Sequence, residues 1–88
     1  MFKINDRKGF HITFENGCTV SVQFGKGDYG DNYRYRGDYH DEMPASQTAE
    51  VAAWDEMGNW IKLSEEDDLA AYQSPSEVLE IMNKVANR

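Results

Sequence analysis

The residues best suited to chemistry gather in one stretch of the chain, from Gly25 to Thr48. Four of the five tyrosines lie there with two arginines, and the tripeptide Gly-Asp-Tyr occurs twice. Tyrosine offers a large contact area with a polar tip, and arginine a planar group that forms paired hydrogen bonds. Both are enriched among the residues that dominate protein interfaces. The stretch therefore predicts a partner-binding surface made of Tyr29, Tyr33, Arg34, Tyr35, Arg36 and Tyr39.

Two other interpretations of this stretch stay open. In one, two or three tyrosines fold back over a sheet as an auxiliary core. In the other, tyrosine rings and the guanidinium groups of Arg34 and Arg36 stack against a nucleotide. A connection this long is usually either functional or disordered, and disordered segments are poor in aromatic residues. The tyrosines therefore argue against simple disorder.

A second candidate is an acidic run in the other half of the chain. The formal net charge is -7, with nine basic and sixteen acidic residues. Residues 45–88 hold three basic and nine acidic residues, so this half alone carries -6. The run is either a solvated connection or, with Glu50, Asp55, Glu56, Glu77 and Glu80, a negative face that mimics nucleic-acid phosphates. Its candidate binding residues are Glu65, Glu66, Asp67 and Asp68.

Residues that could catalyse a reaction are few and poorly spaced. His11 is expected on the polar face of a strand, His40 lies in the long stretch, and Cys18 is expected several residues from His11 along the strands. The chain lacks the nucleophile-elbow, phosphate-loop and calcium-loop spacings. We therefore expect no enzyme, no cofactor and no dedicated metal site. Weak binding of divalent cations by carboxylates of the long stretch stays open.

Length and composition set the class of protein. With 88 residues the chain predicts one domain, residues 1–88, that includes a long loop at about 25–48. The negative charge argues against direct, nonspecific nucleic-acid binding. No apolar run reaches the roughly 20 residues of a membrane-spanning helix, the first residues lack a secretory signal, and there is a single cysteine. These features predict a cytoplasmic location.

The first hairpin is the clearest element of the pattern. Apolar residues alternate with polar ones before and after Asn16-Gly17, which is typical of two strands with one buried face. The dipeptide predicts a two-residue turn that pairs Cys18 near Glu15. Phe2 and Ile4 also alternate with polar residues, so a short strand is expected before the hairpin.

A second hairpin and one helix complete the predicted fold. The hairpin spans Ala49–Leu63 around a five-residue connection, and Trp54 and Trp60 are expected to pair across it or to pack on the helix. Ser74-Pro75-Ser76-Glu77 is a capping box that begins a helix over residues 75–86. The predicted class is α+β: an antiparallel sheet of about four strands, made of two β-hairpins joined by a long loop, packed against one C-terminal helix.

The strand and helix motifs also carry a resemblance. Gly9-Phe10-His11-Ile12-Thr13-Phe14-Glu15-Asn16-Gly17, Thr19-Val20-Ser21-Val22-Gln23-Phe24-Gly25, Ala49-Glu50-Val51-Ala52-Ala53-Trp54, Gly58-Asn59-Trp60 and Ser74-Pro75-Ser76-Glu77-Val78-Leu79 are similar to small uncharacterised phage and prophage proteins. The resemblance covers both hairpins and the helix but not residues 26–48. It implies a phage or mobile-element context, in which small acidic proteins are often inhibitors of host defence, including anti-CRISPR proteins. No site residue follows from it.

Together these observations predict a phage-encoded inhibitor that binds a host protein. The expected partner is a nucleic-acid-binding defence effector of a bacterial host, blocked by the acidic half with the tyrosine-rich loop as specificity anchor. The alternatives are a protein that sequesters a small nucleotide signal in a pocket lined by Tyr33, Arg34, Tyr35 and Arg36, and an accessory protein of virion structure or assembly.

Overall fold

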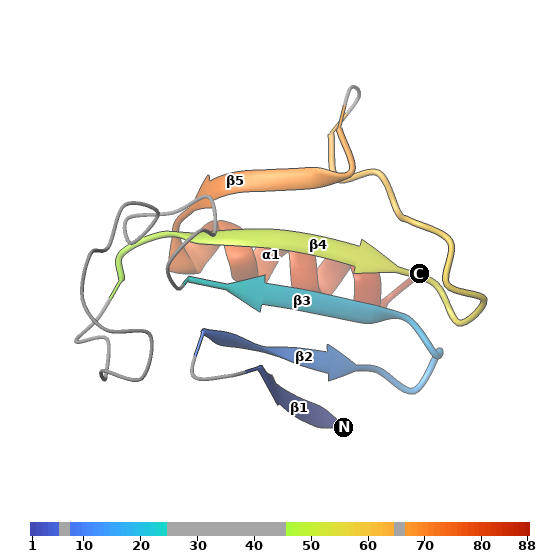
Figure 1. Cartoon of the computed structure of the whole chain (residues 1–88). Coiled ribbons are helices and arrows are strands. Elements are labelled where there is room, and N and C mark those ends of the chain that lie inside the picture. Colours follow the sequence, from blue (N-terminus) through green and yellow to red (C-terminus); the bar gives the residue numbers. More distant parts are fainter. Residues whose placement is uncertain (6–7, 25–45, 65–66) are drawn as a thin grey trace.

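The computed structural model describes residues 1–5, 8–24, 46–64 and 67–88, which form a five-stranded antiparallel sheet and one helix (Figure 1). The strand order in the sheet is the order in the chain. The α+β class is confirmed, but the sheet has five strands rather than about four. The elements are β1 Phe2–Asn5, β2 Gly9–Thr13, β3 Thr19–Gln23, β4 Ala49–Trp54, β5 Leu69–Gln73 and α1 Pro75–Ala86.

The hairpin of β2 and β3 forms as predicted, but its turn is longer by one residue. The Phe14 N–H donates to the Cys18 carbonyl oxygen at 2.9 Å, so the loop is the three residues 15–17. Gly17 takes the left-handed conformation in this loop, with φ at +84°. The predicted two-residue turn, with Cys18 opposite Glu15, was therefore wrong. Side chains alternate between the two faces of a sheet. Only a loop with an odd number of residues therefore puts the apolar residues of both strands on one face.

The short strand before the hairpin is confirmed as β1, at the edge of the sheet. Phe2 lies opposite Ile12 and Ile4 opposite Phe10. The Phe2 and Phe10 rings meet edge to face with centroids 6.0 Å apart. Phe2 and Ile4 nevertheless remain 70% and 81% exposed, because the helix does not reach this edge.

The second predicted hairpin is correct only in its first strand and its turn. In residues 55–59 the Asp55 N–H donates to the Asn59 carbonyl oxygen at 2.9 Å. After the single bridge between Trp54 and Trp60 the chain leaves the sheet, and the neighbour of β4 is β5 instead. Residues 61–64 are not a strand, because Ile61 and Leu63 turn to pack against the core. The prediction missed β5 altogether.

A β-bulge interrupts the pairing of β4 with β5. Ala49 lies opposite Gln73 but Val51 opposite Ala70, so two residues of β5 face the single residue Glu50. One of the two is Tyr72, which has a φ of +54° and is 53% exposed. A non-glycine residue in this region is strained.

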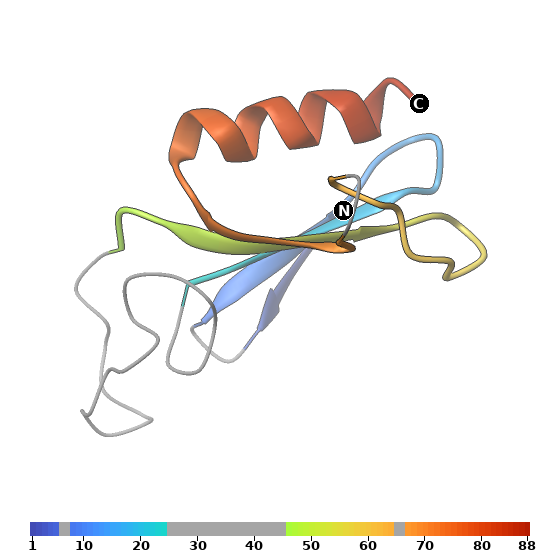
Figure 2. The same ribbon diagram turned by 90° about the horizontal axis from the view of Figure 1, so that it is seen from above.

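The helix α1 forms over the predicted residues and covers one face of the sheet (Figure 2). The Ser74 hydroxyl accepts from the Glu77 N–H at 3.3 Å, and the Glu77 carboxylate accepts from the Ser74 N–H at 2.9 Å. The predicted capping box is therefore confirmed. Val85 of α1 is buried against Val20 and Val51, whose side chains are fully buried.

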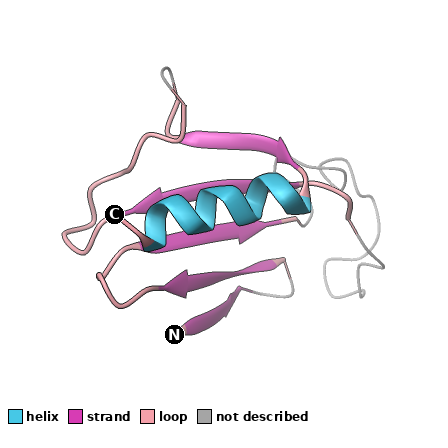
Figure 3. Ribbon diagram, turned by 180° about the vertical axis from the view of Figure 1, so that it is seen from behind, coloured by secondary structure: helices cyan, strands magenta, loops and turns pink. Residues whose placement is uncertain are grey.

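The helix lies over the middle and one side of the sheet only. It contacts β3, β4 and β5, while β1 and β2 extend beyond it (Figure 3). The flank of α1 that faces β5 thus borders the chain segment between β4 and β5. This flank is where charged and apolar residues of the second half of the chain come together.

Candidate functional site

Most of the predicted binding residues lie outside the described part of the chain. This holds for all six residues of the tyrosine-rich stretch and for Glu65 and Glu66. The same is true of His40. Asp67 and Asp68 are described, and Asp67 lies at a hollow between β5 and α1.

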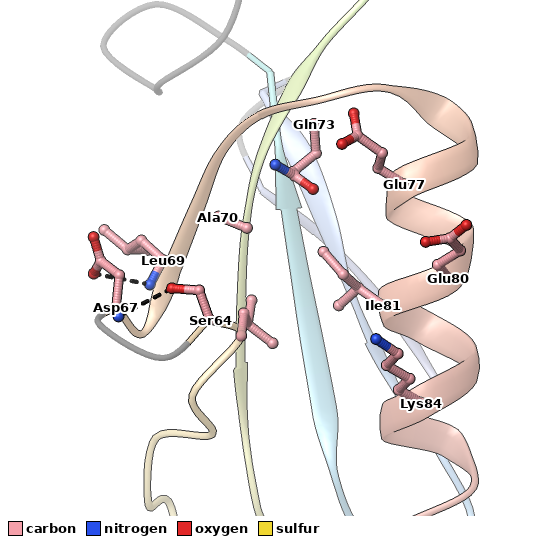
Figure 4. A pocket seen from close by; sticks show the side chains of 10 residues that line it. Ser64, Asp67, Leu69, Ala70, Gln73, Glu77, Glu80, Ile81 and Lys84 are labelled. Atoms are coloured by element: carbon pink, nitrogen blue, oxygen red, sulfur yellow. Dashed lines mark hydrogen bonds between the residues drawn. The ribbon is translucent and has the colours of Figure 1, made fainter.

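The hollow has a volume of about 460 Å³ and opens beside α1 (Figure 4). Its apolar lining consists of half-buried side chains from β5, from α1 and from the segment before β5. Figure 4 shows Ile81 projecting from α1 toward the hollow. Gln73 closes the end nearest the start of α1. The lining residues are Leu63, Ser64, Asp67, Leu69, Ala70, Gln73, Glu77, Glu80, Ile81 and Lys84.

Three carboxylates border this hollow. Asp67 is held by its turn: its N–H donates to the Ser64 hydroxyl at 3.1 Å, and its Oδ1 accepts from the Leu69 N–H at 3.3 Å. Glu77 and Glu80 are exposed on α1. The hydrogen bonds from the Ser74 backbone N–H and, to a lesser degree, the Ser74 side chain hold the pKa of the Glu77 carboxyl below its ordinary value. Glu77 is therefore ionised at neutral pH.

Among the acidic residues of the second half that the structure describes, Glu50, Asp55, Glu56 and Asp68 do not line this hollow. Asp55 and Glu56 lie in the turn after β4. Glu56 packs closely on Gly17, since a Cβ added to Gly17 would lie 2.7 Å from the Glu56 Cβ. The hydrogen bond from the Asn59 N–H holds the pKa of Asp55 below its ordinary value, with a smaller contribution from Arg88. Glu50 points to the face of the sheet away from α1, because it alternates with the core residue Val51. The structure thus joins only part of the expected negative face.

A second hollow, of about 320 Å³, adjoins the first and was not expected from the sequence. It continues along the same flank of α1, since both hollows are lined by Leu63, Ile81 and Lys84. We call the two together the α1 groove. The second hollow has a basic border, and its lining residues are Ile61, Lys62, Leu63, Ile81, Lys84, Val85 and Arg88.

Part of the α1 groove is visible in the sequence. Glu77, Ile81 and Lys84 follow one another at helical spacing and so share one flank of the helix, and Arg88 lies two residues beyond its end. The opposite wall is not visible, because it depends on Ile61 and Leu63 leaving the sheet.

On the other face of the sheet, aromatic side chains cluster around Trp54. Its ring meets that of Trp60 edge to face with centroids 5.7 Å apart, which confirms the predicted cross-strand pair. On its other side His11 lies with its ring centroid 5.0 Å from that of Trp54. Burial, and then the nearby charge of Lys3, lower the pKa of His11. This face combines a neutral imidazole with two indoles.

The thiol of Cys18 and the imidazole of His11 do not come together. Cys18 is buried in the core under α1, whereas His11 lies opposite Ser21 on the other face of the sheet. Within residues 1–5, 8–24, 46–64 and 67–88, no three metal-ligating side chains of His, Cys, Asp or Glu form a group that could hold a metal ion. Among the residues that the structure describes, no helix has the length and apolar character needed to cross a membrane.

Comparison of the chain with family models, with curated proteins and with solved structures found no match.

Proposed function

We propose that this protein acts without catalysis, by binding a basic site on another protein and keeping nucleic acid out of it. The observation that carries the proposal is the meeting of Asp67, Glu77 and Glu80 at one hollow beside α1. Carboxylates on the two sides of one hollow add to the local negative potential, which attracts a basic surface and speeds association at low salt. The net charge of -7 adds to this effect.

The kind of partner follows from the chemistry of the surface and from the phage resemblance. A positively charged nucleic-acid groove is the complement of a carboxylate cluster, since it is built to hold phosphates. In a bacterial host, a nucleic-acid-binding defence effector such as a CRISPR enzyme carries a groove of this kind. We therefore propose an anti-defence inhibitor that works in the host cytoplasm.

The test uses the full chain as bait in host lysate, at low and at high salt. The main variant combines Asp67→Asn, Glu77→Gln and Glu80→Gln. It removes three charges, while the amide side chains introduced at positions 67 and 77 keep acceptor oxygens for the turn and the helix cap. The control variant combines Glu50→Gln, Asp55→Asn and Glu56→Gln, with the same change of charge elsewhere.

The proposal predicts a captured protein that loses its own nucleic-acid binding when the bait is present. Capture should weaken at least about tenfold with the main variant and with rising salt, and much less with the control variant. Equal capture by both variants, or a partner that still binds nucleic acid in the complex, would refute the proposal.

A further inference from the structure

The α1 groove changes its charge from one end to the other. Along the helix flank the order is Glu77, Glu80, Lys84, and Arg88 follows just beyond the end of α1; all four residues are exposed. Asp67 stands across from the acidic half, and Lys62 borders the basic half. The acidic and basic residues are thus separated along the groove rather than interspersed.

Between the charged ends the groove is apolar. Ile61 and Leu63 line it from the segment between β4 and β5, Leu69 lines it from β5, and Ile81 lines it from α1. All four are only partly buried, so each retains apolar surface that a bound chain could remove from water. The length of the groove is set by α1, whose twelve residues span about 18 Å.

The proposed function explains the acidic end of the α1 groove but not its apolar centre or its basic end. A uniformly basic surface would be repelled by Lys62 and Lys84 and would leave the apolar centre uncovered. Arg88 also lies near Asp55, so the two lysines supply most of the unshared positive charge at that end. The whole groove therefore demands a more specific occupant than a basic patch.

We propose that the α1 groove binds a short segment of a partner protein with an apolar centre and opposite charges at its ends. A Lys or Arg of the segment lies near Glu77 and Glu80, and an Asp or Glu lies near Lys62 and Lys84. An extended segment of about five to six residues fits the length, at about 3.3 Å per residue. This inference rests on the proposed function, since it names the part of the partner that the acidic end receives.

Three synthetic peptides with the same four-residue apolar centre test it. The mixed peptide has one lysine at one end and one aspartate at the other, the basic peptide has a lysine at each end, and the acidic peptide has an aspartate at each end, so each peptide is six residues long. Each is titrated into the isotope-labelled full chain, and amide chemical shifts give the Kd and the location. We expect the mixed peptide to bind at least about fivefold more tightly than either other peptide, with shifts at residues of the α1 groove.

Charge reversal sharpens the test. Lys84→Glu should reduce the preference for the mixed over the basic peptide, because it replaces one of the two lysines at that end of the groove with a carboxylate. Lys3→Glu makes the same change of charge on β1, outside the groove, and should leave the preference unchanged. Equal Kd values for the three peptides, or shifts confined to the β1 and β2 face, would overturn the inference.

Two further outcomes separate this inference from its premise. If the carboxylate variant loses its partner in lysate but the three peptides bind equally, the proposed function stands and the inference fails. If sizing shows a dimer whose dissociation on dilution shifts the groove amides, a second copy fills the groove and the inference also fails. If the mixed peptide is preferred while no basic partner is captured, the segment specificity stands and the proposed function fails.

Discussion

The side chain of Asn16, in the turn between β2 and β3, closes the C-terminal end of α1. Its Nδ2 donates to the carbonyl oxygen of Val85 at 2.9 Å and to that of Ala86 at 3.4 Å. Its Oδ1 accepts from the N–H of Cys18 at 3.0 Å. The last carbonyls of a helix have no partner within the helix, so this contact satisfies two of them and fixes α1 over the sheet.

Replacing Asn16 should destabilise the protein by disconnecting α1 from the turn. Asn16→Ala should lower the free energy of unfolding in urea by about 1–2 kcal/mol, since it removes bonds to partly buried carbonyls. Asn16→Asp should cost at least as much, because it places a negative charge at the negative end of the helix dipole. Asn59→Ala, in the exposed turn after β4, is the control and should cost less. Equal losses for the Asn16 and Asn59 variants would contradict this role.

Gly9 should tolerate no side chain, because β2 and β3 approach closely there. A Cβ on Gly9 would overlap the Val22 carbonyl oxygen and lie 2.9 Å from the Gln23 Cα. Gly9→Ala should therefore lower the free energy of unfolding by about 1–3 kcal/mol and increase hydrogen exchange of the β2 and β3 amides. Gly58→Ala is the comparison: its φ is also unfavourable, at +84°, but a Cβ there meets nothing within 4 Å. Unchanged exchange in β2 and β3 after Gly9→Ala would count against the predicted clash.

Glycine at position 72 should give a more stable protein than valine, which is the reverse of the usual order in strands. Its φ of +54° strains any residue with a Cβ, by about 1–2 kcal/mol. Tyr72→Gly should consequently be more stable to heat than Tyr72→Val, although valine is the better strand residue. At Ala71, which is not in the positive-φ region, the order of the same two substitutions should reverse. The same order at both positions would exclude backbone strain as the cause.

The helix cap should make stability depend on pH in the acidic range. The folded-state pKa of Glu77 is lowered from its ordinary value of 4.5 by the cap hydrogen bonds from Ser74. The cap therefore stabilises the fold fully above the unfolded-state pKa, and this contribution is lost as the pH falls through the folded-state value. The stability difference between the native chain and Glu77→Gln should shrink as urea unfolding is measured from pH 7 to pH 3. Glu80→Gln removes a charge from the same helix without touching the cap and gives the reference; parallel curves for the two variants would contradict the prediction.

The elements predicted correctly are those whose signals are local. The alternation in β2 and β3 and the capping box at Ser74 each depend on a few consecutive residues, and tertiary packing did not override them. The turn length was predicted wrongly from the Asn16-Gly17 pair alone. Three residues separate Phe14 from Cys18, and the apolar faces of two strands match only when an odd number of loop residues lies between them.

β5 could not be predicted because its sequence carries no strand period. Leu69 and Ala70 are followed by the bulge at Ala71 and Tyr72, which breaks the alternation in mid-strand. Trp60, Ile61 and Leu63 have the stronger strand composition, yet Trp60 stays exposed, and Ile61 and Leu63 pack against the core from outside the sheet. The segments around residues 60–63 and 69–73 compete for the free edge of β4, and this competition decides which of them pairs. A local sequence pattern gives no information about its outcome.

The candidate site shows the same division. The helix flank with Glu77, Ile81 and Lys84 follows from sequence spacing, whereas the opposite wall follows from the departure of Ile61 and Leu63 from the sheet. The tyrosine-rich prediction stays a prediction, because its residues lie outside the described part of the chain.

The strand order of the sheet has a consequence for folding kinetics. Because each strand pairs with its neighbour in the chain, most of the sheet forms from contacts close in sequence, which favours fast folding. The exception is β3 with β4, whose pairing closes the longest connection and carries the largest loop-closure entropy. We therefore expect two halves, β1–β3 and β4–α1, to form from local contacts and to join where Val20 and Val51 are buried. Truncating either valine should slow folding, whereas truncating Phe2 at the sheet edge should mainly speed unfolding.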